Sequence, residues 1–365
     1  MHIFLIGLIN QNNWMLIKKI NLLLIIFVFI SNVNVYASKE FSVSALFETP
    51  QVKINGNADD PAIWFNETNP GLSIIFGTDK YNGIYSYNLK GEIIGFSESG
   101  SINNIDLRTY KDSTYIVGTD TSANKIYLWK YKNSYLHKKS KEGSFSIDET
   151  PHYSDEVNFL AYGVCAGLID DQFISFVTEA KGPRVRLWKF SGNNLNLVNT
   201  FNNSNASESE GCAIDDENKK LFISEENQRG VLRSYSLTKD LELSNKIRID
   251  DRSGNIVGDP EGLAILKTSP TNGYLIASSQ GNNTFNIYDR TEPHAYVGSF
   301  QIKENNSIDG VSDTDGLEIV NTFLNSDFEE GLLVVQDGKN TGENTIPKEN
   351  FKLLSLSEIK QYLTF

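Results

Sequence analysis

The sequence predicts an all-β fold, a six-bladed β-propeller whose four-stranded antiparallel blades surround a central channel. A short phrase, in which an acidic or amide residue usually precedes an alternating apolar run, recurs six times. Successive copies are roughly 45 to 60 residues apart, which is the period of a propeller blade rather than of a helical repeat. Strand-type alternation dominates each period, and only residues 356–363 show a weak helical pattern.

The six copies define where the innermost strand of each blade begins. They are Asp59-Asp60-Pro61-Ala62-Ile63-Trp64, Asn103-Asn104-Ile105-Asp106-Leu107-Arg108, Tyr162-Gly163-Val164-Cys165, Glu210-Gly211-Cys212-Ala213-Ile214, Glu261-Gly262-Leu263-Ala264-Ile265 and Asp315-Gly316-Leu317-Glu318-Ile319. The first strand of a blade lines the channel, so equivalent positions of the six copies are expected to converge around one axis.

Each copy is followed by a β-rich run, usually then by a turn containing Gly or Asn, and by a second apolar strand. The paired runs are residues 72–78 with 83–89, 114–119 with 125–131, 172–178 with 184–190, 220–225 with 230–237, 273–279 with 285–289, and 331–335 with 351–354. An unpaired edge strand would be exposed, so we expect residues 41–47 to complete the last blade beside the C-terminal segment.

The first 37 residues have the pattern of an export signal. Two lysines precede an almost wholly apolar run over residues 20–30, and small residues stand ahead of a cleavage site after Ala37. A membrane anchor is the alternative, but about a dozen apolar residues are too few to span roughly 30 Å of hydrocarbon. We therefore expect a secreted or periplasmic protein, free of the membrane after cleavage, with residues 38–365 as one propeller domain.

The chain is strongly acidic. Its formal net charge is −13, and loss of residues 1–37 removes two lysines and no acid, which gives −15. Such a surface repels nucleic acid and anionic membranes, so neither is an expected partner. An anionic substrate would need metal ions or local basic residues to be held. An acidic propeller needs no partner chain, and we expect a monomer.

The chain contains two cysteines, Cys165 and Cys212. In an exported protein they are expected to form one disulfide. Two buried free thiols are the alternative, while a metal site built from two cysteines without nearby histidines is not favoured.

Acidic residues recur at similar points of the repeats and predict a ring of carboxylates at one mouth of the channel. Its members are Asp59, Asp60, Asp106, Glu210, Asp259, Glu261, Asp313 and Asp315, with Glu225, Glu226 and Asp337 at the ends of second strands and Gln280 as a neutral oxygen donor. Closely packed carboxylates repel one another unless cations lie among them. Oxygen donors without paired histidines favour Ca²⁺ over Zn²⁺ or a transition metal.

A simpler interpretation exists for each acid, because a single Asp in a propeller loop is more often a turn residue. Eight acids at similar phases are harder to explain in that way. The segment 309–316 is alternatively a calcium loop that only holds the fold. Basic residues near this mouth are few: Lys80, Arg108 and Lys181 are each ordinary surface charges alone, but beside a calcium mouth they could contact the oxygens of a phosphate.

Together these motifs resemble the β-propeller phytases, the alkaline, calcium-dependent phytases, over essentially the whole mature chain. The resemblance rests on Asp59-Asp60-Pro61-Ala62-Ile63-Trp64, Asn103-Asn104-Ile105-Asp106-Leu107-Arg108, Glu210-Gly211, Glu225-Glu226, Asp259-Pro260-Glu261-Gly262-Leu263, Ala277-Ser278-Ser279-Gln280-Gly281-Asn282, Ser312-Asp313-Thr314-Asp315-Gly316 and Gln336-Asp337-Gly338.

The resemblance implies structural calcium ions and an active-site calcium cluster that holds a cleavage phosphate site beside an affinity phosphate site. By motif, the active-site ligands are Glu48, Asp59, Glu210, Glu226, Asp259, Glu261, Gln280 and Asp315, and the structural calcium region includes Asp309 and Asp337. Phosphate contacts are assigned to Lys80, Tyr162 and Lys181, with Arg108 as a further candidate. The catalytic set is then Glu210, Glu226, Asp259, Glu261, Tyr162 and Lys80.

The basic half of the implied site departs from the family pattern. Tyr81 stands where many relatives carry a second lysine, Thr121 where they carry an arginine, and Asn57 where they carry an acid ahead of the Asp-Asp pair. The implied reaction is hydrolysis of phytate (myo-inositol hexakisphosphate) to lower inositol phosphates, in which calcium neutralises phosphate oxygens and activates a water for in-line attack at neutral to alkaline pH.

Two alternatives stay open at this point. One is a calcium-stabilised propeller that binds a sugar or protein without catalysis, and the thinned basic set favours it. The other is a lactonase-type propeller hydrolase, whose usual site has fewer carboxylates around one metal. Histidine phosphatase chemistry is not supported, because none of the four histidines stands in an Arg-His-Gly motif.

Overall fold

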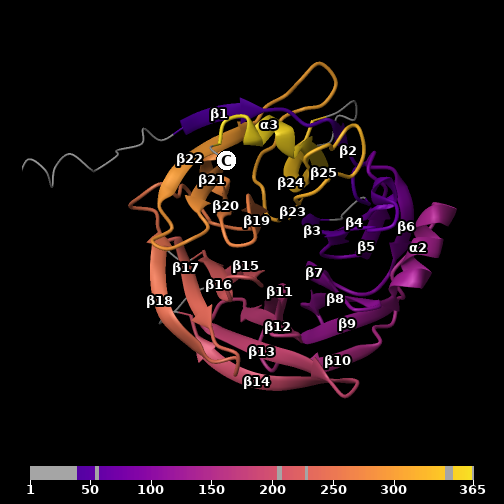
Figure 1. Ribbon diagram of the computed structural model, residues 1–365, viewed down its shortest axis with the longest axis vertical. Helices are drawn as coiled ribbons and strands as arrows, with labels where there is room; N and C mark the ends of the chain where they lie inside the picture. The colour runs from indigo at the N-terminus through magenta and orange to yellow at the C-terminus, as the bar shows by residue number, and fades with distance from the viewer. Residues whose placement is uncertain (1–38, 54–56, 204–207, 227–228, 342–347, 364–365) are drawn as a thin grey trace, which may run out of the picture. The chain divides into compact units, whose positions relative to one another are not determined.

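Six β-sheets surround a central channel, which confirms the predicted six-bladed propeller (Figure 1). The computed structural model describes residues 39–53, 57–203, 208–226, 229–341 and 348–363. Its sheets all belong to one unit, Lys39–Phe365. The predicted export signal at residues 1–37 lies outside the described residues. No helix within the described ranges is long and apolar enough to cross a membrane.

The first three blades follow the chain in simple order, each from the channel outward. Blade 1 contains β3 (Ala58–Trp64), β4 (Ile74–Asp79), β5 (Gly83–Tyr87) and β6 (Ile93–Ser97). Blade 2 contains β7 (Ile102–Tyr110), β8 (Ser113–Asp120), β9 (Lys125–Lys132) and β10 (Tyr153–Glu156). Blade 3 contains β11 (Ala161–Ile169), β12 (Gln172–Glu179), β13 (Arg184–Ser191) and β14 (Asn194–Asn202).

The remaining blades have the same antiparallel core. Blade 4 contains β15 (Ser209–Asp215), β16 (Lys220–Glu225), β17 (Val231–Leu237) and β18 (Leu243–Asp250). Blade 5 contains β19 (Leu263–Lys267), β20 (Gly273–Ser279), β21 (Thr284–Asp289), β22 (Tyr296–Ile302) and β1 (Lys39–Val43). Blade 6 contains β23 (Leu317–Val320), β24 (Leu332–Asn340), β25 (Lys348–Ser355) and β2 (Phe47–Glu48). Four of the six predicted inner phrases start at the second residue of an innermost strand, and the other two start two residues before one.

Ring closure differs from the prediction that residues 41–47 complete the last blade. The N-terminal segment is divided between two blades: β1 pairs in parallel with β22 of blade 5, and only β2 pairs with β25 of blade 6. Leu46 N donates to Leu353 O at 2.8 Å and Thr49 N to Phe351 O at 2.9 Å, so the chain crosses the junction as a continuous hydrogen-bonded segment. The exposed edges of both blades are thereby covered.

The apolar cores lie between neighbouring blades. For example, Trp64 of β3 and Trp129 of β9 are fully buried in a cluster shared by blades 1 and 2, and Trp188 of β13 is buried between blades 2 and 3. Burial of one such ring contributes roughly 2 to 3 kcal/mol. The alternating apolar residues that identify the strands therefore also fix the order of the blades.

Within the described residues, two α-helices and two short 3₁₀ turns accompany the sheets. The weak helical pattern predicted at 356–363 is seen as α3 (Leu356–Lys360), whereas α2 (Asn133–Glu142) was not predicted. Helix α2 buries only three residues and is otherwise polar, so it has no wide apolar stripe that a pattern search could find. The 3₁₀ turns are η1 (Pro70–Leu72) and η2 (Gln280–Asn282).

Candidate metal and phosphate site

Bulges in the innermost strands aim polar side chains at one mouth of the channel. The ladder between the first and second strands is interrupted between Ala58 and Pro61, and equivalent interruptions occur in blades 2, 3 and 4. A bulge re-aims side chains that regular pleating would direct elsewhere. The residues inside the four bulges are Asp59 and Asp60, Asn103 and Asn104, Tyr162 and Gly163, and Glu210 and Gly211.

The glycine that follows the acid in several phrases allows neighbouring inner strands to approach. A Cβ added to Gly211 would lie 2.1 Å from the main-chain oxygen of Glu261, and one added to Gly316 would lie 2.7 Å from that of Asp59. Both distances are too short for any other residue. The repeated acid-Gly pattern is therefore a packing requirement that also brings successive acids together.

Hydroxyl groups on the second strands hold these bulges in place, and sequence reasoning missed them. Thr78 Oγ1 donates to the main-chain oxygen of Asn103 in the next blade at 2.7 Å, and Ser224 Oγ donates likewise to Glu261 O at 2.7 Å. Ser278 Oγ donates to Thr314 O at 2.7 Å. The available signal was a Ser or Thr placed before the polar residue that ends the second strand, repeated in five blades.

Three glutamates from two blades form the densest part of the mouth. Ligand oxygens of Glu210, Glu226 and Glu261 lie within 4.8 Å of one another, a spacing that a single cation could bridge. Glu210 is the second residue of β15, Glu226 follows β16, and Glu261 precedes β19. Asn103 Nδ2, from blade 2, donates to Glu210 Oε1 at 2.8 Å.

Several oxygens of this cluster lack a partner. Asp59 Oδ2, together with Glu226 Oε1 and Glu261 Oε2, is buried and accepts no hydrogen bond from any residue that the structure describes. Burial and neighbouring carboxylates raise the pKa of Glu226 to about 9 and that of Glu261 well above its usual value. Burial likewise raises the pKa of Asp59. Burial therefore disfavours the charged forms of these groups unless a cation lies among them.

Lys80 is the basic residue at the centre of the cluster. Its Nζ lies 2.9 Å from Asp59 Oδ1, 3.7 Å from Glu210 Oε1 and 3.9 Å from Asp315 Oδ2. Burial opposes its charge, but these carboxylates raise the pKa of Lys80 and keep it an ammonium. Burial alone would raise the pKa of Glu210, but Lys80 and hydrogen bonds lower it, so the negative charge is held there.

Tyr162 lies against the same charges. Lys80 Nζ is 5.9 Å from the centre of its ring, and its phenol donates a hydrogen bond that lowers the pKa of Glu210. Burial and three surrounding glutamates raise the pKa of Tyr162 far above its usual value. Thr119 Oγ1 donates to the main-chain oxygen of Tyr162, which fixes the bulge that carries it.

Asp259 and Asp315 complete the mouth, each with a partner that sequence analysis did not assign to it. Asp259 forms an ion pair with Arg252, a residue that the repeat pattern does not reveal because it lies in the loop between β18 and β19. Gln280 Nε2 donates to Asp315 Oδ1 at 2.8 Å. Burial is the main reason that the pKa of Asp315 rises to about 6.

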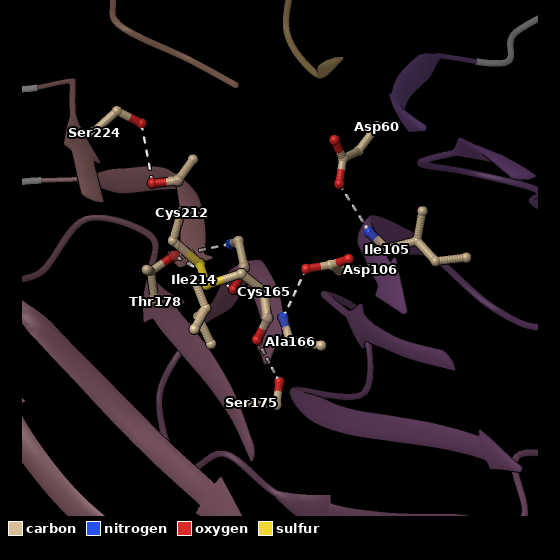
Figure 2. The surroundings of a disulfide bond; sticks show 12 residues. Asp60, Ile105, Asp106, Cys165, Ala166, Ser175, Thr178, Cys212, Ile214 and Ser224 are labelled. Carbon is tan, nitrogen blue, oxygen red and sulfur yellow. Dashed lines mark hydrogen bonds between the residues drawn. A yellow bond between two sulfur atoms is a disulfide. The ribbon is translucent and has the colours of Figure 1, made fainter. Parts of the chain in front are cut away.

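The ring of eight acids predicted at one mouth is divided in the structure. Asp60 Oδ2 accepts from Ile105 N at 3.0 Å, and Asp106 Oδ2 accepts from Ala166 N at 2.8 Å, so both carboxylates join inner strands of adjacent blades (Figure 2). Consecutive residues of a strand point in opposite directions, which separates Asp59 from Asp60. Asp313 also differs, because it pairs with Lys339 in a partly exposed loop.

Arg108 lies away from Lys80 and Tyr162. Its Nη1 is 3.0 Å from Asp106 Oδ1 and its Nε is 3.2 Å from Asp216 Oδ2, and it lines a channel cavity with these two acids and Glu318. Arg108 lies further along β7, past the bulge at Asn103 and Asn104 that aims side chains at the mouth. The expectation that Arg108 contacts phosphate therefore finds no support in the geometry.

Glu48, Asp309 and Asp337 form a second cluster, separate from the first. Lys352 Nζ lies 2.5 Å from Glu48 Oε2 and 3.3 Å from Asp337 Oδ2, and it also pairs with Asp309. Glu48, assigned by motif to the active-site calcium, is therefore placed with the structural set. An ammonium therefore lies among these carboxylates, where calcium was expected.

Lys181, the remaining predicted phosphate contact, is exposed. Lys181 stands in the turn after β12 with φ 62° and forms no ion pair with a described residue. Tyr81 is 67% exposed and borders a hollow with Asn82, Glu98 and Ser101. Thr121 Oγ1 donates to Ser101 O at 3.2 Å. Tyr81 and Thr121, two of the three departures from the family pattern, thus lie at the same junction of blades 1 and 2.

Cys165 and Cys212 form a disulfide with a Cα–Cα distance of 5.6 Å (Figure 2). It joins β11 to β15, the innermost strands of blades 3 and 4. Cys165 is fully buried, and Cys212 lines the channel cavity. The bond therefore ties together the two strands that carry Tyr162 and Glu210.

Comparison with known proteins identifies the family of this chain. The sequence profile of the phytase family matches residues 14–364. This chain belongs to the phytase family. A 3-phytase from Bacillus subtilis (strain 168) is 29% identical to this phytase over 344 residues, which cover 90% of this chain and 87% of that protein.

A gluconolactonase from Xanthomonas campestris shares the propeller fold with this phytase. The TM-score is 0.51 at 10% identity, and the match covers 87% of this chain and 99% of that chain. Such low identity shows the fold alone. The lactonase alternative therefore gains nothing from it, while the family match identifies the enzyme as a phytase.

The carboxylates at the mouth of this phytase fit a hard cation. Their partnerless oxygens come from three blades and are accompanied by a side-chain amide, Gln280, which is the donor set that Ca²⁺ takes. The pairing of Lys80 with Asp59 neutralises only part of the charge. The mouth is therefore the candidate metal centre, and Lys80 and Tyr162 are the candidate phosphate contacts.

Proposed function

We propose that this phytase is a calcium-dependent phosphomonoesterase that hydrolyses phytate to lower inositol phosphates. The observation that carries the proposal is the set of buried, partnerless carboxylate oxygens on Asp59, Glu226 and Glu261. A buried anion without a partner is costly, and a protein retains such groups where a cation satisfies them. The name of the Bacillus subtilis relative, 3-phytase, supports the substrate.

The calcium ions would be held by the mouth carboxylates and one amide. These residues are Asp59, Glu210, Glu226, Asp259, Glu261, Gln280 and Asp315. Bound calcium would supply positive charge to the phosphate oxygens and lower the pKa of a water, so that no protein nucleophile is needed.

Lys80 and Tyr162 act as hydrogen-bond donors to the phosphate. Lys80 keeps its charge because carboxylates surround it, so it can donate to an equatorial oxygen as negative charge develops there. The raised pKa of Tyr162 keeps its phenol protonated, which makes it a donor rather than a general base. Arg252 holds Asp259 and thereby orients one metal ligand.

A second phosphate of the substrate is held weakly. The hollow at the junction of blades 1 and 2 is bordered by Tyr81, Glu98 and Ser101 and by no described lysine or arginine. Lys181 is the remaining exposed base in the proposed contact set. The ring of Tyr81 and the hydroxyl of Ser101 suit a neutral hydroxyl group of the substrate better than a phosphate. Inositol phosphates with a free hydroxyl beside the scissile phosphate should therefore compete well with phytate.

Export completes the proposal. The N-terminal pattern supports removal of residues 1–37, leaving a monomeric propeller of residues 38–365 in the periplasm or outside the cell. N-terminal sequencing of the protein recovered from its native compartment tests this: a mature chain that begins near Ser38 is expected, and a retained Met1 or Met15 would contradict it.

Phosphate release from calcium-phytate at pH 7–8 tests the enzymatic proposal. Release is expected from the wild type, and EGTA and Glu226→Gln should each abolish it. The matched control is Glu92→Gln, an exposed acid on a hairpin, which should leave the rate unchanged. Release that persists in EGTA would overturn the calcium dependence, and no release by the wild type would overturn phytate as the substrate.

A further inference from the structure

Glu349, a carboxylate that sequence analysis did not single out, lies within electrostatic reach of Asp315 and Lys80 of the candidate metal centre. It lies near the start of β25, where its main-chain oxygen accepts from Val52 N at 3.1 Å. Asn57 Nδ2 donates to Glu349 Oε1 at 3.0 Å. The other oxygen, Oε2, is buried and has no hydrogen-bond partner in the described part of the chain, and it feels the charges of Asp315 and Lys80.

We infer that Glu349 is an additional ligand of the proposed calcium cluster and supplies the carboxylate that Asn57 lacks. The inference rests on the proposed function. The amide of Asn57 fixes one oxygen of Glu349, and the other accepts no hydrogen bond from a described residue, so it is available as a ligand. An acid at position 57 would repel Glu349 across the same contact. We therefore expect one carboxylate at this contact, which either position 57 or position 349 could provide.

A charge swap tests this assignment through calcium affinity. Equilibrium dialysis with ⁴⁵Ca²⁺ is expected to show about tenfold weaker binding in Glu349→Gln, because affinity follows the ligand charge count. The double variant Asn57→Asp/Glu349→Gln should recover most of the loss, and Glu92→Gln should match the wild type. The melting temperature in EGTA checks folding and should not fall in Glu349→Gln, since the change removes a buried charge.

Failure of this inference can be told apart from failure of the proposed function. Unchanged calcium affinity in Glu349→Gln, with a calcium-binding wild type, overturns only the role of Glu349. A swap variant that binds no better than Glu349→Gln also overturns it, because position 57 would then not share the ligand role. A wild type that binds no calcium overturns the proposed function and the inference with it.

The second carboxylate cluster supports a separate inference about ring closure. Lys352 is 0% exposed, and an ammonium has three hydrogens to donate. Its Nζ donates to Glu48 Oε2, to Asp309 Oδ1 and to Asn340 Oδ1, so all three are used. Lys80 differs, because its Nζ pairs with three carboxylates at 2.9 to 3.9 Å and is 20% exposed.

The geometry points to Lys352 as a permanent internal cation that takes the place of calcium at the ring closure. The groups it joins come from β2, from the loop before β23, and from β24 and β25, which are the segments that close the ring. A substrate with six phosphate groups itself binds calcium. A covalently attached ammonium cannot be removed by such a substrate, so the fold would stay closed while the active-site ions exchange.

Melting temperatures with and without EGTA test this role. Chelation should lower the melting temperature of Asp309→Asn by the same amount as that of the wild type, because calcium is absent from this cluster. Lys352→Met should melt roughly 10 °C lower in EGTA, since it leaves buried carboxylates unpaired, and should gain a calcium-dependent rise larger than that of the wild type.

A smaller chelator effect in Asp309→Asn than in the wild type would overturn the inference, because calcium would then bind at Asp309. Lys352→Met without any added response to calcium would overturn the idea that the ammonium fills a cation site. If Lys352→Met does not fold, the chelator effect in Asp309→Asn still tests the inference. Lys352→Arg keeps the positive charge, so its response to EGTA should match that of the wild type.

Discussion

Arg252 forms an ion pair with Asp259, and its guanidinium also lies 3.4 Å from the main-chain oxygen of Glu226. One cation therefore joins the end of blade 4 to the beginning of blade 5, at two of the proposed calcium ligands. Asp259 and Glu226 repel each other, and their mutual charge contributes to the raised pKa of Glu226. Arg252 offsets this repulsion before any metal binds.

Replacement of Arg252 should therefore affect the metal centre more than the fold. Arg252→Gln is expected to lower kcat/KM for calcium-phytate by about 10²-fold, because Asp259 loses the group that orients it. The calcium concentration for half-maximal activity should rise, and Arg252→Lys should restore part of both. Steady-state kinetics at several calcium concentrations provide the measurement. Equal losses in Gln and Lys, with normal calcium dependence, would show a merely structural role.

Glu261→Gln should have opposite effects on stability with and without calcium. In EGTA the variant is expected to melt at or above the wild-type temperature, because one buried, partnerless carboxylate is removed. With calcium it should melt below the wild type, because a ligand is lost and binding contributes less to stability. Differential scanning fluorimetry in both buffers measures this. A lower melting temperature in both would contradict a metal-ligand role.

The fold was almost fully predictable from the sequence because apolar alternation carries the blade period. The predicted runs 220–225 and 273–279 coincide with β16 and β20, and others differ by a few residues at their ends. Helix α2 could not be predicted, since few of its residues are buried. The split of the N-terminal segment between blades 5 and 6 also had no signal, because parallel and antiparallel edges suit the same β-prone residues.

The site was less predictable, since motif position alone does not give the direction of a side chain. Asp59 and Asp60 are adjacent in sequence, yet one lies in the carboxylate cluster and the other binds the neighbouring inner strand. Arg252, Glu349 and Lys352 lie outside the inner phrases, so no repeat marks them. Their roles depend on contacts between segments up to 304 residues apart, as for Lys352 and Glu48.

Lys80→Met should separate substrate charge stabilisation from metal binding. The loss of an ammonium inside the cluster is expected to lower kcat for calcium-phytate by about 10²-fold. Calcium affinity should be kept or strengthened, because the ammonium competes with calcium for Asp59, 2.9 Å away. Kinetics and calcium titration on the same preparation test both parts. Weaker calcium binding in Lys80→Met would show that Lys80 instead supports the metal site.

Removal of the disulfide should lower stability with little direct effect on chemistry. Cys165→Ala/Cys212→Ala is expected to lower the free energy of unfolding by about 2 to 4 kcal/mol, because the bond closes a loop of 47 residues. Activity at 25 °C should stay within a few-fold of the wild type, since hydrogen bonds also hold the bulges. Urea unfolding and phosphate release measure the two effects. Unchanged stability would show that the bond is not formed in solution.

His294 gives the protein a specific sensitivity to mild acid. Its Nε2 lies 3.1 Å from Ser234 Oγ and its Nδ1 3.1 Å from Asp289 O, in a buried site between blades 4 and 5. Burial lowers the pKa of His294, and the nearby charges of Lys220, Glu292 and Asp289 oppose one another. Over a range of pH below about 6.5, the imidazole is therefore neutral in the folded protein, whereas it is already protonated in the unfolded chain.

The sign of the pH dependence follows from this difference. Because the folded pKa lies below the unfolded value of about 6.5, the stability is complete above that pH and falls as the pH drops through it towards the folded pKa. His294→Asn, which tolerates the φ of 58° at this position, should remove this fall and leave the pH dependence above pH 7 as it is in the wild type. Urea unfolding at pH 5.5, 6.5 and 7.5 measures both proteins. Equal slopes in the wild type and the variant would assign the acid sensitivity to other groups.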